Sequence, residues 1–363
     1  MNHPENDPVY RGLSVNQGVA RPPSVNPYLK TRKRREYSPS EYVEQIIKGN
    51  RSVLSQAVTL IESHRQDHQL IAQEVIEKCL PFASKSVRIG ITGVPGAGKS
   101  TSIDAFGMHL IKNRHKKIAV LAIDPSSARS NGSILGDKTR MESLSREMDA
   151  FIRPSPSAGS LGGVARKTRE TIVLCEAAGF DTVFVETVGV GQSETAVHSM
   201  VDFFLLIQLA GAGDELQGIK RGIMEMADGI IVNKADGDNI EKAKLAAAQF
   251  RSALQLFPLP ASGWSPKVLT YSGYYEWGVK EVWDMVYEYI DFTKTNGYFD
   301  KNRNEQSKFW MYETINEQLK ANFYQHPVME RELKWKEQQV LHCEISSFIA
   351  AKQLLDQYAW KMK

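Results

Sequence analysis

Residues 93–101 form a glycine-rich segment, GVPGAGKST, that matches the pattern G-x-x-x-x-G-K-S/T. An apolar β-branched run precedes it and an apolar helical pattern follows it, so the segment is predicted to join a strand to a helix. Its glycines let backbone N–H groups point inward around phosphate oxygens. Lys99 can reach the β- and γ-phosphates, and the Ser100 hydroxyl can bind Mg²⁺. The alternative, a turn without a ligand, is disfavoured by the complete motif in this context. The candidate nucleotide-binding residues are Gly93, Gly96, Ala97, Gly98, Lys99, Ser100 and Thr101.

Asn233, Lys234 and Asp236 form the pattern N-K-x-D at the end of a later apolar run. A carboxylate at the position of Asp236 can accept hydrogen bonds from both the N1–H and the exocyclic amine of guanine, whereas adenine offers the wrong pattern. Losing such a paired contact in a buried site costs several kcal/mol, which is enough to select one base. The short pattern occurs often by chance. Its place at a strand end, after a phosphate loop, predicts binding of GTP and GDP.

The run VFVETVGVGQSE, residues 183–194, ends a predicted strand with Glu186 and then breaks at glycines. A carboxylate there can hold Mg²⁺ directly or through water, and the backbone N–H of Gly189 can sense a γ-phosphate. The alternative is a buried strand with a turn after it, which needs no acid. Ras-type GTPases place a water-orienting glutamine directly after this glycine; here that residue is Val190, and Gln192 comes two positions later. We therefore expect slow intrinsic hydrolysis unless a partner supplies the missing group.

Short apolar runs between residues 87 and 272 supply the strands that must position these residues. The runs are VRIGIT, KIAVLAID, DAFIRP, DTVFVET, DFFLLIQL, DGIIVNK and KVLTYS. Helix-like segments separate most of them. Strands that are apolar on both faces and alternate with helices predict a mostly parallel sheet covered by helices on both sides. The predicted fold class is therefore α/β, with a P-loop nucleotide-binding domain.

Helical patterns flank this region on both sides. Residues 38–82 carry apolar residues at helical spacing after a capping serine, Ser38 or Ser40, and two long helical patterns lie at 303–325 and 328–358. The tail has many large apolar side chains and little partner surface of its own, so we expect it to pack on a second subunit; packing back on the parent domain is the alternative. The predicted domains are a flexible leader (1–37), an N-terminal helical segment (38–84), a P-loop GTPase domain (85–296) and a C-terminal helical dimerisation arm (297–363).

The composition argues against several other classes of protein. The chain has 363 residues, a formal net charge of +3 and 9% aromatic residues, so its bulk charge indicates neither nucleic-acid nor membrane-surface binding. The basic cluster at residues 30–35 is interpreted as a solvated arm. Residues 1–35 lack a secretory apolar core, and no apolar run approaches the length of a membrane span. Three widely separated cysteines imply neither a disulfide framework nor a zinc ribbon, so a reducing, cytoplasmic location is expected.

Several stretches together resemble the MeaB/ArgK family of P-loop GTPases. They are AIDPSSARSNGSILGDKTRM, FIRPSPSAGSLGGVARKTRETI, VETVGVGQSE and LAGAGDELQGIKRGIMEMADGIIVNKADGDN. The resemblance covers about residues 40–290 and is most specific between residues 88 and 239. Members act as metallochaperones of cobalamin-dependent acyl-CoA mutases such as methylmalonyl-CoA mutase. The resemblance thus implies a GTPase that gates cofactor loading and protection, slow alone and stimulated by the mutase. An adenosyltransferase is a further implied partner, and a homodimer is implied by the C-terminal arm.

The resemblance also implies roles for individual residues. It assigns Lys99, Asp124 and Glu186 to catalysis, and it places acids and a hydroxyl near Mg²⁺. The implied Mg²⁺ neighbours are Ser100, Asp124, Asp137 and Glu186. By its type alone, Asp137 fits a turn residue equally well. The segment AGAGDELQGIKRG resembles the extra switch that relays the nucleotide state to the mutase; a glycine-rich loop before a helix capped by Asp214 is the alternative. The implied switch and partner residues are Gly189, Gln192, Asp214, Glu215, Gln217 and Lys220.

Two positions depart from the family pattern. Asn131 stands in RSNGS where members usually carry a glycine, and asparagine tolerates left-handed backbone. The loop that supports the guanine reads YSGYYEWG in place of an S-A-L-like sequence, so Ser272 is assigned to guanine binding less directly than Asp236.

Two rival functions are compatible with a phosphate loop. The first is an ATP-dependent kinase linked to periplasmic amino-acid (lysine/arginine/ornithine) transport, an older label for the same family. It would need adenine selectivity and a phospho-acceptor, and the N-K-x-D pattern argues against it. The second is a maturation GTPase for a metal such as nickel, whose relatives typically carry histidine- or cysteine-rich segments that this sequence lacks. We therefore predict the GTPase chaperone.

Overall fold

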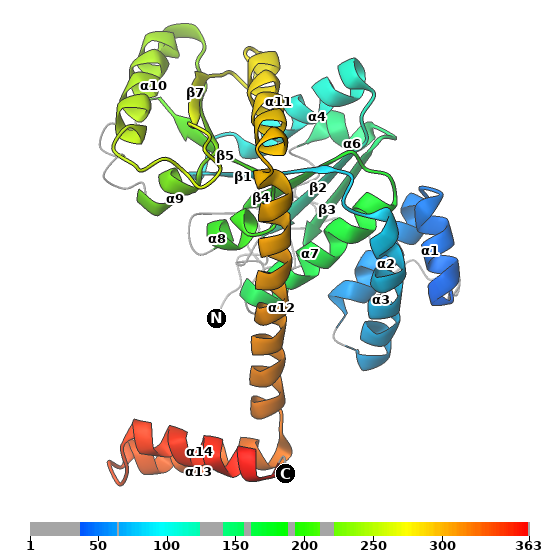
Figure 1. Ribbon diagram of the computed structural model, residues 1–363, viewed down its shortest axis with the longest axis vertical. Helices are drawn as coiled ribbons and strands as arrows, with labels where there is room; N and C mark the ends of the chain where they lie inside the picture. Colours follow the sequence, from blue (N-terminus) through cyan, green and yellow to red (C-terminus); the bar gives the residue numbers. More distant parts are fainter. Residues whose placement is uncertain are drawn as a thin grey trace, which may run out of the picture. The chain divides into compact units, whose positions relative to one another are not determined.

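The computed structural model describes residues 37–63, 65–123, 141–155, 161–187, 193–210 and 221–361. Within these residues, seven parallel strands form one sheet in the order β3-β2-β4-β1-β5-β6-β7 (Figure 1). The strands are β1 (Val87–Gly93), β2 (Ile118–Ile123), β3 (Ala150–Ser155), β4 (Thr182–Thr187), β5 (Phe203–Leu209), β6 (Gly229–Asn233) and β7 (Lys267–Thr270). Each strand coincides with one of the predicted apolar runs, so the predicted α/β fold is confirmed.

Helices cover both faces of the sheet, which is why its strands are apolar on both sides. These helices are α4 (Lys99–Arg114), α6 (Glu142–Arg146), α7 (Leu161–Ala177), α8 (Ser193–His198), α9 (Arg221–Met226), α10 (Ile240–Leu254) and α11 (Val279–Thr295). Alternate residues of β5 show the two faces: Phe203 and Leu205 pack in the cluster with α4, α6 and α11, whereas Leu206 packs in the cluster with α9 and α10. On the second face, α8 lies so close to β1 that a Cβ on Gly90 would meet Val197 at 2.9 Å.

Helices α1 (Pro39–Ile47), α2 (Arg51–Glu62) and α3 (Gln66–Cys79) precede the sheet and confirm the predicted N-terminal helical segment. They pack on one another, and each also contacts α7 (Figure 1). Ser38 is the N-cap of α1: its hydroxyl accepts from the N–H of Glu41, and the Glu41 carboxylate accepts from the N–H of Ser38. This capping box fixes where the described helical region begins.

The C-terminal region consists of α12 (Tyr298–Tyr324), α13 (Pro327–Leu341) and α14 (Ser347–Lys361). The prediction of one helix over 328–358 was wrong, because a turn between α13 and α14 divides that segment. Cys343 in this turn has a left-handed φ of 58°, which an α-helix does not accommodate, and the Ser346 hydroxyl then accepts from the N–H of Ile349 at 3.3 Å. Helices α13 and α14 pack side by side beyond the C-terminal end of α12 (Figure 1).

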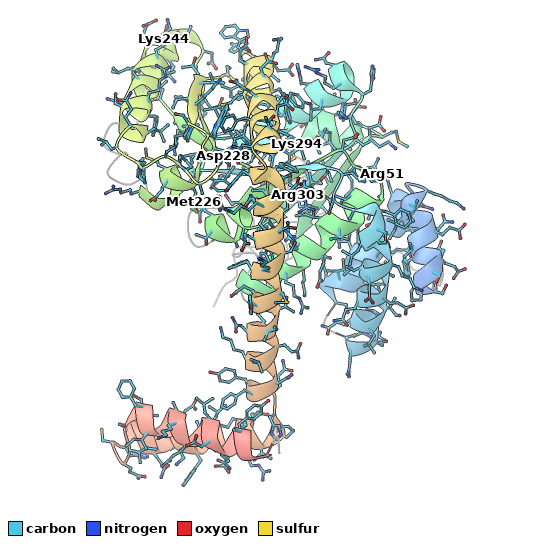
Figure 2. The ribbon with its side chains drawn as sticks, viewed as in Figure 1. Arg51, Met226, Asp228, Lys244, Lys294 and Arg303 are labelled. Atoms are coloured by element: carbon cyan, nitrogen blue, oxygen red, sulfur yellow. The ribbon has the colours of Figure 1, made fainter. Side chains whose placement is uncertain are left out.

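One face of α12 attaches the C-terminal region to the loop before β5. Arg303, Gln306 and Trp310 lie at helical spacing, and all donate to this loop. The Arg303 guanidinium binds both carboxylate oxygens of Asp202 at 2.7 Å, while Gln306 and Trp310 donate to the carbonyls of Val201 and Ser199. Arg303 (labelled in Figure 2) belongs to the early turns of α12, so the anchor is made where the helix leaves α11.

The described residues from Ser38 onward belong to one compact unit. The domain boundaries proposed at residues 84 and 296 stay predictions, and the proposed leader lies outside the described residues except for Tyr37. In the described part of the chain, we find no helix that combines the length and the apolar character needed to cross a bilayer.

Candidate nucleotide site

The phosphate loop joins β1 to α4, as the sequence predicts, and two of its glycines are required by close contacts. Gly93 has a φ of 154°, and a Cβ there would lie 2.2 Å from the carbonyl oxygen of Ile207 on β5. Gly98 has a φ of 88°, and its Cβ would lie 2.4 Å from Nδ2 of Asn233 on β6. Glycine at these positions therefore lets the loop close against β5 and against Asn233 at the end of β6.

The N-terminus of α4 faces the same loop. Gly98 is its N-cap, and none of the described side chains caps the helix there, so its first N–H groups and its dipole favour an anion. The ammonium of Lys99 donates to the carbonyl oxygen of Gly93 at 2.8 Å, which holds the charge over the loop. Ser100 and Thr101 follow in the first turn of the helix.

The predicted metal ligands Ser100 and Glu186 lie in direct contact. β4 runs beside β1 with Glu186 in register with Ile91, which brings the carboxylate to the start of α4. The Ser100 hydroxyl donates to Oε1 of Glu186 at 3.0 Å, and Glu186 is 4% exposed. Hydroxyl and carboxylate oxygens suit Mg²⁺, which usually takes few protein ligands and completes its shell with phosphate oxygens and water. These residues therefore fit Mg²⁺, even though no group of three or more His, Cys, Asp or Glu side chains gathers among the described residues.

Asn233 connects the phosphate loop to two further loops. Its side-chain amide donates to the carbonyl oxygen of Ala97 at 2.7 Å. Its carbonyl oxygen accepts from the N–H of Lys234 at 2.7 Å and from the N–H of Gly273 at 3.0 Å. Asn233 is 3% exposed, so these bonds are shielded from water. The phosphate loop and the loops after β6 and β7 are thus held as one assembly.

Asp236, the predicted guanine-reading residue, lies against Ser272 in this assembly. The Ser272 hydroxyl donates to Oδ2 of Asp236 at 2.5 Å, and Ser272 is fully buried. Lys234 has a left-handed φ of 59°, an uncommon conformation for lysine that often marks functional loops. The neighbouring Tyr271 packs on Phe106, and burial raises the pKa of its phenol, which therefore stays neutral. The structure thus places Ser272, whose assignment to guanine binding was less direct, in contact with Asp236.

The structure brings the described candidate residues to the carboxyl ends of β1, β4, β6 and β7, the edge where parallel α/β sheets bind ligands. The residues brought together are Gly93, Gly96, Ala97, Gly98, Lys99, Ser100, Thr101, Glu186, Asn233, Lys234, Asp236 and Ser272. The remaining candidates lie outside the described residues; they are Asp124, Asp137, Gly189, Gln192, Asp214, Glu215, Gln217 and Lys220.

Sequence reasoning missed two features of the site. The first is the backbone N–H of Gly273, which completes the bonds of Asn233; the only signal was a Ser-Gly pair after the last apolar run. The second is a hydrogen bond between the hydroxyls of Thr187 and Thr92, at 2.9 Å, which ties the end of β4 to β1 beside Glu186. Both features join residues that are far apart in the sequence, so a single sequence does not predict them.

Comparison with known proteins agrees with this geometry. The family model described as Methylmalonyl Co-A mutase-associated GTPase MeaB matches residues 54–327. GTPase ArgK of Escherichia coli is 44% identical over 292 residues, which are 80% of this chain and 88% of the relative. The protein named methylmalonic aciduria type A homolog, mitochondrial, of Mus musculus is 44% identical over 320 residues, 85% of this chain and 77% of the relative.

A solved structure described as LAO/AO transport system kinase has a TM-score of 0.71 and 36% identity, and the match covers 90% of this chain and 99% of that one. The family model covers more than half of the chain, and both named relatives exceed 40% identity over most of their length. This chain therefore belongs to the MeaB family of methylmalonyl-CoA mutase-associated GTPases.

Proposed function

We propose that this chain binds GTP with Mg²⁺, hydrolyses it to GDP and phosphate, and relays the change to a cobalamin-dependent acyl-CoA mutase of the methylmalonyl-CoA type. The observation that carries the proposal is the set of hydrogen bonds by which Asn233 joins the phosphate loop to the loops that hold Asp236 and Ser272. A phosphate cradle and a guanine-reading carboxylate in one hydrogen-bonded assembly fit a single nucleotide. The mutase comes from the family description and from the name of the mouse relative.

The chemistry follows from where the side chains lie. When the nucleotide binds, the Lys99 ammonium releases the carbonyl oxygen of Gly93 and donates to β- and γ-phosphate oxygens instead. It then neutralises the negative charge that builds up as the γ-phosphoryl group leaves GDP. The N–H groups of the phosphate loop and of the first turn of α4 hold the same oxygens in place. Ser100 and Glu186 hold the metal, which when bound supplies positive charge to the phosphates. Water attacks the γ-phosphorus as the bond between this phosphorus and the β,γ-bridging oxygen breaks. The bridging oxygen stays on GDP, the γ-phosphoryl group leaves with the water oxygen as phosphate, and a proton is released to solvent.

Stimulation by the partner is part of the proposal. Val190 stands where a water-orienting glutamine would act, and a valine side chain has no group that can hydrogen-bond water. The chain alone should therefore hydrolyse GTP slowly, and the bound mutase should raise the rate. Asp124 and Asp137 are proposed to assist Mg²⁺. The segment AGAGDELQGIKRG (210–222), with Asp214, Glu215, Gln217 and Lys220, is proposed to form the switch that the mutase reads. Gating of cofactor loading and protection then follows the nucleotide state.

The C-terminal helices are proposed to form a homodimer. Many large apolar side chains are exposed along these helices, and exposed apolar surface of this extent is typical of protein–protein interfaces. They include Phe309, Met311, Tyr312, Ile315, Leu319, Trp335, Leu341, Phe348, Ile349 and Leu355. An adenosyltransferase remains a proposed second partner, and a cytoplasmic location is proposed from the cysteines, all of which are free thiols.

The proposal is tested by titrating the purified chain with GTP, GDP and ATP in a calorimeter, with Mg²⁺ present. We expect GTP and GDP to bind at least a hundredfold more tightly than ATP, because the paired contact to Asp236 contributes several kcal/mol. Turnover of GTP is then measured with and without the mutase. Equal affinities would contradict guanine recognition. Fast turnover by the chain alone would contradict dependence on the partner.

An ATP-dependent kinase of amino-acid transport is the second candidate, because the solved relative at 36% identity is described as a transport system kinase. The site argues against it, since the Asp236 carboxylate would repel the N1 lone pair of adenine, and a hydrogen bond from Ser272 fixes that carboxylate. Competition between ATP and GTP for the chain distinguishes the two: displacement of bound GDP by ATP at similar concentrations would favour the kinase.

A further inference from the structure

The loop after β7 displays three aromatic side chains beside the proposed base-reading residue. Ser272 and Trp277 close this loop through two backbone hydrogen bonds, from the N–H of Ser272 to the carbonyl of Trp277 at 3.0 Å and in the reverse direction at 3.1 Å. Between them, Tyr274 is 82% exposed and Tyr275 is 53% exposed, and Trp277 itself is 53% exposed. A tight six-residue loop thus presents three large rings outward.

The rings are ordered with respect to one another. Tyr275 stacks on Trp277 with centroids 5.0 Å apart and an interplanar angle of 23°, and Tyr274 meets Tyr275 edge to face at 4.9 Å. Such pairs are attractive beyond the area they bury, so Tyr275, itself stacked on Trp277, holds the Tyr274 ring from one side. The other side of the Tyr274 ring faces solvent, as its large exposed fraction shows. Clustered exposed rings of this kind mark binding sites.

The start of the loop is fixed to the residues proposed to read the base. The Ser272 hydroxyl donates to Asp236 at 2.5 Å and accepts from the N–H of Tyr275 at 3.3 Å, while the N–H of Gly273 donates to Asn233 at 3.0 Å. Tyr274 is two residues from Ser272, so the Cα atoms of these residues are at most about 7 Å apart. A base whose edge is held by Asp236 therefore lies within reach of the Tyr274 ring.

We propose that Tyr274 is a base-stacking residue of the nucleotide site, whose ring lies on the face of the guanine that Asp236 holds by its edge. This inference rests on the proposed function, because it needs a guanine nucleotide at Asp236. Stacking depends on the π-face that every base has, so Tyr274 contributes affinity to all nucleotides, and Asp236 contributes the choice of guanine. GTP and GDP share the same base, so the ring strengthens the binding of both equally and does not report the γ-phosphate.

The test compares the full-length wild-type chain with Tyr274→Ala, Tyr274→Phe and a control variant, Tyr324→Ala. Tyr324 is a comparably exposed tyrosine on α12, 61% exposed, and forms no part of the site. Calorimetry with Mg²⁺ gives the Kd of GTP and GDP for each chain. We expect Tyr274→Ala to weaken both by roughly tenfold, as for the loss of one base–aromatic stack. Tyr274→Phe, which keeps the ring, and Tyr324→Ala should match the wild type.

The possible failures are distinguishable. If the wild-type chain prefers GTP to ATP but Tyr274→Ala binds GDP with an affinity within about twofold of wild type, the stacking role is overturned and the proposed function stands. If the affinity is unchanged while stimulation of hydrolysis by the mutase is lost, the rings form a protein-docking surface and the stacking role is again overturned. If the wild type shows no guanine preference, both proposals fall. Thermal unfolding of Tyr274→Ala should match the wild type, because the ring is largely outside the core.

Discussion

Replacing Arg303 by alanine should destabilise the chain far more than the loss of one surface arginine. Arg303 of α12 donates to both oxygens of Asp202 at 2.7 Å and to the carbonyl oxygens of Ser84 and Ser86 at 2.8 and 2.7 Å. The Asp202 side chain is 1% exposed, so alanine at position 303 leaves a buried carboxylate whose remaining described hydrogen-bond donor is the N–H of Arg88. Breaking a buried ion pair from one side typically costs about 3–5 kcal/mol, and we expect a loss of that size.

The assay is urea unfolding of the full chain, followed by tryptophan fluorescence. Trp310, one of the six tryptophans that contribute to this signal, lies two turns further along α12 and donates to the carbonyl of Ser199. The control is Arg331→Ala on α13, where the side chain is exposed; it should change the free energy of unfolding by less than about 0.5 kcal/mol. Adding Asp202→Asn to Arg303→Ala removes the stranded charge and should restore part of the loss. A loss below about 1 kcal/mol for Arg303→Ala would refute the reasoning, because Asp202 would then not be desolvated.

Three further outcomes are expected. Burial raises the pKa of the Asp228 carboxyl from 3.8 to about 7, although the hydrogen bond from the N–H of Phe204 lowers it. Protonated Asp228 therefore stabilises the folded chain at low pH, and this stabilisation is lost as the pH rises through 7. The gain in unfolding free energy from Asp228→Asn should therefore grow by roughly 2–3 kcal/mol between pH 5 and pH 8 in urea titrations; a pH-independent effect would contradict this. Ser100→Ala should reduce the strengthening of GDP binding by Mg²⁺, measured against EDTA, by roughly tenfold or more, and an unchanged Mg²⁺ effect would remove Ser100 from the metal site. Phe348→Ser, at a side chain 86% exposed, should shift the chain toward monomer in light scattering, whereas Leu256→Ser, 79% exposed and outside the C-terminal helices, should not; equal masses would argue against the dimer arm.

The strands were predictable because buried strands are rich in apolar residues, which the sequence shows as short apolar runs. Strand β4 (Thr182–Thr187), for example, is buried along its whole length. Parallel strands that are covered on both faces need such continuous apolar runs. The positions of the phosphate loop and of Asp236 at strand ends were predictable because each motif directly follows an apolar run; their roles in nucleotide binding stay predictions. The contact of Ser100 with Glu186 follows from the pairing of β1 with β4, which places two local motifs at one edge.

The features that sequence reasoning missed depend on contacts between distant segments. Arg303 and Asp202 are ordinary charged residues in the sequence, and only the docking of α12 makes them a buried pair. The break between α13 and α14 has no glycine or proline to announce it; Cys343 adopts the left-handed conformation there because the packing of the two helices on each other requires a turn. The aromatic loop was noticed only as a departure from the family pattern, and its relation to Asp236 required the structure.

Guanine recognition by Asp236 is the central claim, and exchanging the nucleobase tests it most directly. Xanthine carries a carbonyl where guanine carries its exocyclic amine, so an amide side chain can donate to xanthine where the carboxylate accepts from guanine. Calorimetry of Asp236→Asn with GDP and xanthosine diphosphate should show the preference inverted, with GDP weakened by a hundredfold or more, on the order of the several kcal/mol that the paired contact supplies. Unchanged affinity for GDP, with no gain for xanthosine diphosphate, would show that Asp236 does not read the base.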